Sequence, residues 1–325
     1  MNNQNQEDII LDANVLYESY KMALKASPMK PLTQKFEDNW LHNIGIIQGD
    51  LRSGRYAPAK KTEFIIRERG KVRLIRAAPM RDKVVQHALC DFVLIPAIRP
   101  KIIYDNYASL KHRGISMARK RFEMMVHKFY RKHKTNQGFI LLMDFSGYYD
   151  NMRHDLVRKI VGDQTAQGVA IYFPTKIDYH MKIVRGEKYY GRYMDDSNDI
   201  HISKQHLIEV LREVKEIAAS LGIILNDKKV KILPLSKPFT YLQIKYFLTP
   251  TGRLVKRINP KRVTSMRRKL KKLHKMMLAG QRKFKSIYDL YHSWERDYFR
   301  LMSKIQRRNT QTLFYSLFSE EVKKI

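Results

Sequence analysis

The sequence is poor in cysteine and has no long apolar run. Its single cysteine, Cys90, excludes an internal disulfide and a cysteine-based zinc site. A reducing, cytoplasmic setting fits this composition. No stretch approaches the roughly 18 consecutive apolar residues of a membrane-spanning helix. The polar segment from Met1 to Asp8 also lacks the apolar region of a secretory signal. We therefore expect no membrane segment and no leader.

Acidic residues are also scarce relative to basic ones. The chain of 325 residues has 63 Lys and Arg against 31 Asp and Glu, which gives a formal net charge of +32. A surface of this charge repels itself unless a polyanion neutralises it. Nucleic acid is the first candidate, because phosphate neutralisation supplies most non-specific affinity, and an anionic membrane surface is the alternative. Hydrophobic residues make up 44% of the chain, enough for a folded core in two or three subdomains.

Apolar residues recur with helical spacing in several segments. We expect helices over residues 8–25, 33–47, 79–93, 114–132 and 204–221. β-prone residues 62–67 and 72–77 flank a turn at Gly70, which predicts a basic hairpin. Further strands are expected at residues 139–144, 223–233 and 239–248.

Basic residues dominate one long segment. From Lys228 to Tyr288 the chain has 19 Lys or Arg residues and no Asp or Glu. Within it, Asn259 and Pro260 predict the start of a helix that Gly280 ends. Its apolar residues alternate at spacings of three and four, so one face docks and the other is densely basic. A second helix to Leu301 and a short terminal helix are expected to follow.

Two adjacent acids stand at the tip of a predicted hairpin. A strand-like stretch rich in tyrosine ends at Tyr193 and Met194 and is followed by Asp195 and Asp196. A second strand-like stretch then extends to Ile202. Neighbouring carboxylates repel each other, and burial increases the repulsion unless water or a divalent cation screens them. The alternative interpretation is an exposed acidic turn.

A third acid follows an apolar run. Residues Phe139 to Met143 read as a buried strand that delivers Asp144 to its end. Three carboxylates at strand ends or turns could hold two Mg²⁺ ions, which prefer oxygen ligands. Two such ions about 4 Å apart stabilise the attacking and leaving oxygens of a phosphoryl displacement. The basic hairpin could clamp a triphosphate, or it could equally be a solvated edge protected against aggregation. The basic helices would hold a nucleic-acid duplex.

Five segments resemble, in order, the motifs of bacterial reverse transcriptases, such as those of diversity-generating retroelements, group II introns and phage-defence systems. The resemblance runs from about Lys71 to Trp294. It is carried by residues 72–75 with 81–89, 142–150, 193–196, 221–229 and 241–243.

The resemblance implies an α+β right-hand polymerase fold. Its parts would be an N-terminal extension and fingers at 1–137, a palm with an antiparallel sheet at 138–250, and a helical thumb and tail at 251–325. The implied activity is RNA-templated DNA synthesis with two Mg²⁺ ions, or Mn²⁺ in their place. The implied partners are an RNA template, a DNA or RNA primer, their RNA–DNA duplex, deoxynucleoside triphosphates and a dedicated structured RNA, with room for an accessory protein.

The same resemblance assigns roles to individual residues. Asp144, Asp195 and Asp196, with the carbonyl of Phe145, would bind the metal ions. The residues that would contact the nucleotide are Lys71, Arg73, Tyr149, Gln167 and Lys229. The residues that would contact template or primer are Arg81, Tyr241, Lys261, Arg262, Arg268 and Lys272.

Individual roles have alternatives. The ring of Tyr149 would exclude a ribose 2′-hydroxyl; the alternative is a core aromatic. A ribonucleotide polymerase is a further alternative activity. Lys229 would assist departure of pyrophosphate.

The stretch between Asp144 and Asp195 is shorter than the family usually has, and Asn198 and Asp199 are more polar than usual after the catalytic turn. These departures leave open a second hypothesis. The chain could be a catalytically impaired RNA-binding scaffold derived from such an enzyme.

Overall fold

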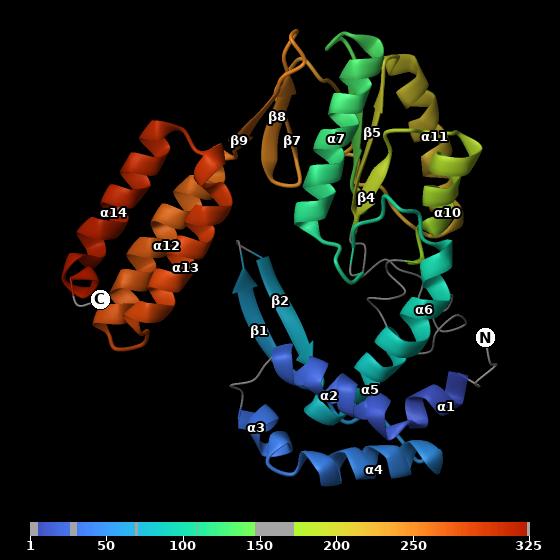
Figure 1. Cartoon of the computed structure of the whole chain (residues 1–325), viewed down its shortest axis with the longest axis vertical. Helices are drawn as coiled ribbons and strands as arrows, with labels where there is room; N and C mark the ends of the chain where they lie inside the picture. The colour runs from blue at the N-terminus through green and yellow to red at the C-terminus, as the bar shows by residue number, and fades with distance from the viewer. Residues whose placement is uncertain (1–5, 27–30, 69–70, 109, 147–171, 324–325) are drawn as a thin grey trace. The chain divides into compact units, whose positions relative to one another are not determined.

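The computed structural model describes residues 6–26, 31–68, 71–108, 110–146 and 172–323 (Figure 1). These residues form helices and three antiparallel sheets, in agreement with the predicted α+β class. They belong to two compact units. Unit 1 covers Met1–Gly114, Ser146–Gly186 and Glu216–Ile224, and unit 2 covers Ile115–Phe145, Glu187–Lys215 and Leu225–Ile325. The chain therefore passes between the units repeatedly, and the division into fingers, palm and thumb stays a prediction.

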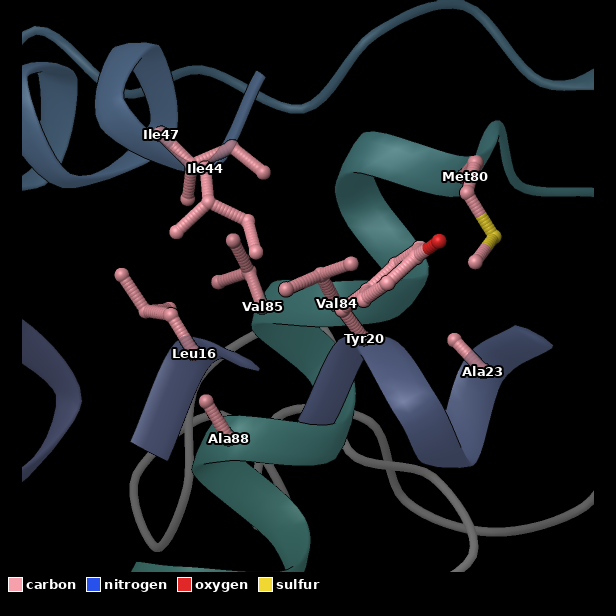
Figure 2. Close-up of a cluster of buried hydrophobic side chains, with 9 residues drawn as sticks. All are labelled: Leu16, Tyr20, Ala23, Ile44, Ile47, Met80, Val84, Val85 and Ala88. Carbon is pink, nitrogen blue, oxygen red and sulfur yellow. The ribbon is translucent and has the colours of Figure 1, made fainter. Parts of the chain in front are cut away.

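Five helices of unit 1 share one apolar core. They are α1 (Gln6–Leu11), α2 (Ala13–Ala26), α3 (Pro31–Glu37), α4 (Trp40–Arg52) and α5 (Met80–His87). Figure 2 shows nine buried side chains of this core, contributed by α2, α4, α5 and the residue after α5. The predicted helix over 8–25 is split at Asp12, because its carboxylate accepts hydrogen bonds from the amides of Asn14 (2.6 Å) and Val15 (3.2 Å) and so caps α2.

The predicted basic hairpin is present in unit 1. It consists of β1 (Thr62–Glu68) and β2 (Lys71–Ala77), paired in full antiparallel register. The chain continues after α5 through η1 (Ala88–Leu94), α6 (Ile95–Ile98) and η2 (Arg99–Lys101). Unit 1 also contains α10 (Thr175–Tyr179) and η3 (His180–Val184).

Unit 2 is built on a four-stranded sheet in the order β4-β5-β3-β6. The strands are β3 (Phe139–Met143), β4 (Gly191–Tyr193), β5 (Asp196–His201) and β6 (Lys231–Pro234). The apolar sequence of β3 suits its position between two neighbours, because a central strand is buried on both sides. The long helix α7 (Ile115–His133) contacts β4 and β5. A second long helix, α11 (Lys204–Ser220), follows β5 in the chain and runs from unit 2 into unit 1.

A second sheet of unit 2 contains a strand that the sequence did not predict. Its strands are β7 (Phe239–Tyr241), β8 (Ile244–Leu248) and β9 (Leu254–Ile258). The ring of Phe122 from α7 packs against Tyr241 and Tyr246, with centroid distances of 4.9 and 5.1 Å. β9 was not predicted because its two adjacent basic residues interrupt the alternation of apolar and polar residues that is typical of a strand. One of them, Lys256, pairs with Glu123 of α7 at 2.9 Å.

Three helices end the described chain. They are α12 (Pro260–Leu278), α13 (Phe284–Tyr298) and α14 (Lys304–Val322), with the short η4 (Phe299–Leu301) between the last two. Asn259 caps α12 as predicted, since its side chain accepts a hydrogen bond from the amide of Lys261 at 3.1 Å. The predicted apolar face of α12 is buried against α13 and α14. The terminal helix lies within the segment 303–325 where a helix was predicted, and Ser303 and Gln306 form a capping box at its start. None of the helices in the described ranges is long and apolar enough to cross a membrane.

Candidate active site

The β4–β5 hairpin fixes the two adjacent acids. Tyr193 pairs with Asp196, so Met194 and Asp195 form a two-residue turn. Met194 has a φ of 56°, in the left-handed region that costs a residue with a side chain about 1 kcal/mol or more. Its carbonyl accepts a hydrogen bond from Nη1 of the fully buried Arg192 at 3.0 Å. The arginine therefore stabilises a strained turn that carries Asp195 and is followed directly by Asp196.

Strand pairing brings the third acid to the same place. Met143 is in register with Ser197, so Asp144 leaves β3 beside Asp196 at the start of β5. The backbone of Asp144 is held as well, because its carbonyl accepts a hydrogen bond from the amide of Asn226 at 2.8 Å. The prediction that a buried strand ends directly before Asp144 is confirmed.

A lysine neutralises the buried carboxylate. Asp144 is 5% exposed, and Nζ of Lys229 lies 2.8 Å from each of its two carboxylate oxygens. The side-chain amide of Asn226 adds a longer contact of 3.4 Å to one oxygen. The hydrogen bond to Asp144 raises the pKa of Lys229, which keeps the ammonium charged.

The other two carboxylates retain their mutual repulsion. Burial, and then the charges of Asp195 and Asp144, raise the pKa of Asp196 to about 7. Burial and then the charge of Asp144 also raise the pKa of Asp195. Lys229 opposes both shifts without cancelling them. The hairpin therefore concentrates negative charge that a cation would stabilise.

A cavity of about 490 Å³ opens beside these groups. This volume falls within the range of small-molecule sites. Its walls combine acids, lysines and the β7–β8 turn. They include Asp144, Asp196, Lys228, Lys229, Lys231, Tyr241 and Leu242. A phosphate-bearing ligand in this cavity would meet both lysines and carboxylates.

The predicted metal ligands have the right chemistry for Mg²⁺. All are oxygen donors, and the Phe145 backbone that would supply a carbonyl is adjacent to Asp144 and bridged to Leu225. Within the residues that the structure describes, however, no three His, Cys, Asp or Glu side chains already form a metal-binding group. The Asp144 oxygens face Lys229 instead, so this ammonium would have to move for a metal ion to share Asp144 with the hairpin.

The structure describes the predicted nucleotide-binding residues only in part. Lys71 and Arg73 lie in β2 of unit 1, and their side chains are outside the described part. Tyr149 and Gln167 also fall outside the described residues. Of this predicted set, Lys229 alone is placed at the cavity. The other assignments stay predictions.

The predicted template and primer residues divide into three kinds. Arg81 is engaged inside unit 1, where it pairs with Asp50 at 2.8 Å. Tyr241 lines the cavity. Four residues lie on α12, and of these Arg262 donates to Gln243 and lies over the ring of Tyr298. The remaining three are exposed on the basic face of α12: Lys261, Arg268 and Lys272.

Two arginines of the site were not predicted. Arg192 holds the turn of the acidic hairpin, and Arg119 of α7 donates two hydrogen bonds to the carbonyl of Leu242 in the β7–β8 turn. In the sequence they are two of many basic residues. Only burial in one case and tertiary packing in the other distinguish them.

Comparisons with known proteins give weak similarity. No family model and no curated protein matches the chain. Two solved structures of apo telomerase from Candida tropicalis are similar to it in part. The one truncated from its C-terminal domain has 10% sequence identity and a TM-score of 0.42, over 63% of this chain and 58% of that one. The other has 11% identity and a TM-score of 0.40, over 67% of this chain and 53% of that one. The chain thus spans just over half the length of either structure, and similarity at this level assigns neither a family nor an activity.

Proposed function

We propose that the chain is a reverse transcriptase that extends a primer 3′-hydroxyl on an RNA template by two-metal nucleotidyl transfer. One observation carries the proposal: strand register brings Asp144 together with Asp195 and Asp196 beside a cavity lined with lysines. Phosphoryl transfer needs positioning and charge neutralisation rather than covalent chemistry, and this arrangement can provide both.

The three acids have the same part in the proposal, which is to hold the metal ions. Asp144, Asp195 and Asp196, with the carbonyl of Phe145, would hold Mg²⁺, or Mn²⁺ in its place. Bound there, the metal would neutralise the developing charge on the attacking and leaving oxygens. Lys229 would leave Asp144 in the loaded enzyme, and its ammonium would then be available to the departing pyrophosphate.

Charge supports nucleic acid as the macromolecular partner. The face of α12 opposite its buried residues is basic and exposed, and its helix lies in the segment that lacks acids. Such a face would neutralise phosphates of an RNA–DNA duplex without reading its sequence. The duplex would therefore lie on the proposed thumb at 251–325, next to a palm at 138–250. A dedicated structured RNA of a bacterial retroelement or defence element is part of the same proposal.

One observation favours a second candidate, an RNA-binding scaffold without polymerase activity. Lys229 neutralises Asp144 with a side chain of the protein itself. A scaffold of this kind would keep the basic surface and the fold, but it would gain nothing from a concentration of carboxylates at the hairpin.

Primer extension separates the two candidates. With oligo(dT) on poly(rA) and Mg²⁺, we expect extension by the wild type and a loss of about a thousandfold or more in Asp195→Ala, because a transition-state metal ligand is removed. The matched control is Asp227→Ala, an exposed acid whose partner is Lys215. Wild-type extension no better than that of Asp195→Ala would refute the polymerase proposal and favour the scaffold.

A further inference from the structure

The β7–β8 turn adopts a conformation that its sequence disfavours. Tyr241 pairs with Ile244, which leaves Leu242 and Gln243 as the two central residues. Both have left-handed backbones, with φ values of 44° and 71°. Hairpins of this kind favour asparagine and glycine at these positions, because a side chain clashes with the backbone. Contacts from outside the turn must therefore hold it in place.

Two helices supply those contacts. On α7, Nε and Nη2 of Arg119 donate to the Leu242 carbonyl at 3.1 and 2.8 Å. On α12, Nη1 of Arg262 donates to the side-chain oxygen of Gln243. The guanidinium of Arg262 lies 4.9 Å from the ring centroid of Tyr298, at the end of α13. Arg119 thus binds the backbone of the turn, and Arg262 connects the turn to α12 and α13.

The β7–β8 turn forms part of the wall of the candidate active site. Tyr241 and Leu242 line the same cavity as Asp144 and Asp196. The acidic hairpin uses the same arrangement, since Arg192 holds the carbonyl of the left-handed Met194. Both strained turns of the site therefore have a carbonyl fixed by an arginine.

We propose that Arg119 is a positioning residue that keeps the Leu242 turn at a fixed separation from the carboxylates. This inference rests on the proposed function and adds to it that the cavity receives the 3′ end of the primer. The nucleotide at the primer 3′ end would contact the turn and not Arg119. Loss of Arg119 would let the turn relax, which would weaken and misplace the bound primer end.

The geometry also explains why an arginine is needed. Two nitrogens of one planar guanidinium share a single carbonyl, whereas a lysine would offer one nitrogen at the end of a flexible stem. We therefore expect Arg119→Lys to lie between the wild type and Arg119→Met in every measurement.

Hydrogen exchange tests the clamp without any substrate. In the metal-free protein, we expect amides of residues 242–245 to exchange about tenfold or more faster in Arg119→Met, because a charge-assisted bond no longer opposes local opening. Replacing Leu242 by Asn and Gln243 by Gly in that variant should restore slow exchange, since the turn then prefers its conformation unaided. The matched control is Lys120→Met, which removes an exposed charge next to Arg119 on α7.

Steady-state extension links the clamp to the reaction. We expect Arg119→Met to raise the KM for primer–template about tenfold, with a smaller change in kcat, and the Asn-Gly turn to reverse the rise. Amide exchange in Arg119→Met that equals the wild type would overturn the inference. The inference would also fail if the Asn-Gly turn restored neither slow amide exchange nor the wild-type KM. If the wild type extends no primer, the proposed function fails, whereas the exchange experiment still decides whether Arg119 holds the turn.

Discussion

Lys229→Met removes the ammonium that holds both oxygens of Asp144 in the metal-free protein. The side chain of Asp144 is 7% exposed, whereas that of Lys229 is 60% exposed. Breaking a buried ion pair costs about 3–5 kcal/mol, and an exposed pair contributes about 0.2–1 kcal/mol. A pair with one buried and one exposed partner should lie between these limits. We expect Lys229→Met to lower the free energy of unfolding by about 1–3 kcal/mol in EDTA.

Metal should abolish this penalty. A cation bound at the three acids replaces the lysine as the counter-charge of Asp144, so the variant should approach wild-type stability in saturating Mg²⁺. Urea denaturation of the wild type, Lys229→Met, Asp144→Asn and the double variant, with EDTA and with Mg²⁺, gives a double-mutant cycle in each condition. The coupling between Lys229 and Asp144 should be about 1–3 kcal/mol in EDTA and near zero in Mg²⁺. Lys228→Met is the control, because it removes a charge from the wall of the same cavity and leaves both members of the Lys229–Asp144 pair in place.

The cycle can contradict this reasoning in two ways. A coupling near zero in EDTA would mean that water already screens Asp144 and that the ion pair contributes nothing. An equal coupling with and without Mg²⁺ would mean that the metal does not replace Lys229, which would argue against Asp144 as a shared metal ligand.

Two further perturbations address the neighbouring acids and the basic helix. Because the pKa of Asp196 is raised to about 7, the carboxyl favours the folded state most below its ordinary pKa of 3.8, and this contribution diminishes as pH rises through about 7. Metal-free Asp196→Asn should therefore be more stable than the wild type by about 1–2 kcal/mol at about pH 8, after allowance for screening, with little difference near pH 4. Urea denaturation at both pH values checks this, and a pH-independent difference would contradict it. On α12, the double substitution Arg268→Ala and Lys272→Ala should reduce the slope of log affinity for an RNA–DNA duplex against log salt by about 0.7–0.9 for each phosphate that the helix no longer neutralises. Fluorescence anisotropy over a salt series measures the slope, and an unchanged slope would place the duplex elsewhere.

The acids and their strands could be predicted because their signals are local. An apolar run ending in Asp144 and an aromatic strand ending in Asp195 and Asp196 each describe a short segment. The helix starting after Asn259 was equally clear, since its cap and its alternating spacing lie within its own sequence.

Interactions between distant segments could not be predicted in the same way. Nothing local to Lys229 shows that it reaches Asp144, because the ion pair depends on how β3 pairs with the later strand β6. The left-handed turn at Leu242 contradicts its own residue preferences, and the compensating Arg119 is 123 positions away. The cap at Asp12 was missed for a different reason: the apolar spacing continues through it, so periodicity alone does not show the break.

The antiparallel pairing of β3 with β5 also separates the geometry of the acids from the length of chain between them. Asp144 and Asp196 are neighbours because Met143 faces Ser197 across the ladder, and this register is set by side chains within the two strands. Doubling the length of a connecting loop costs only about 0.6 kcal/mol of closure entropy. Evolution could therefore shorten or lengthen the connection after β3 at little energetic cost. A stretch that is short by the standards of reverse transcriptases is, on these grounds, compatible with an intact set of carboxylates.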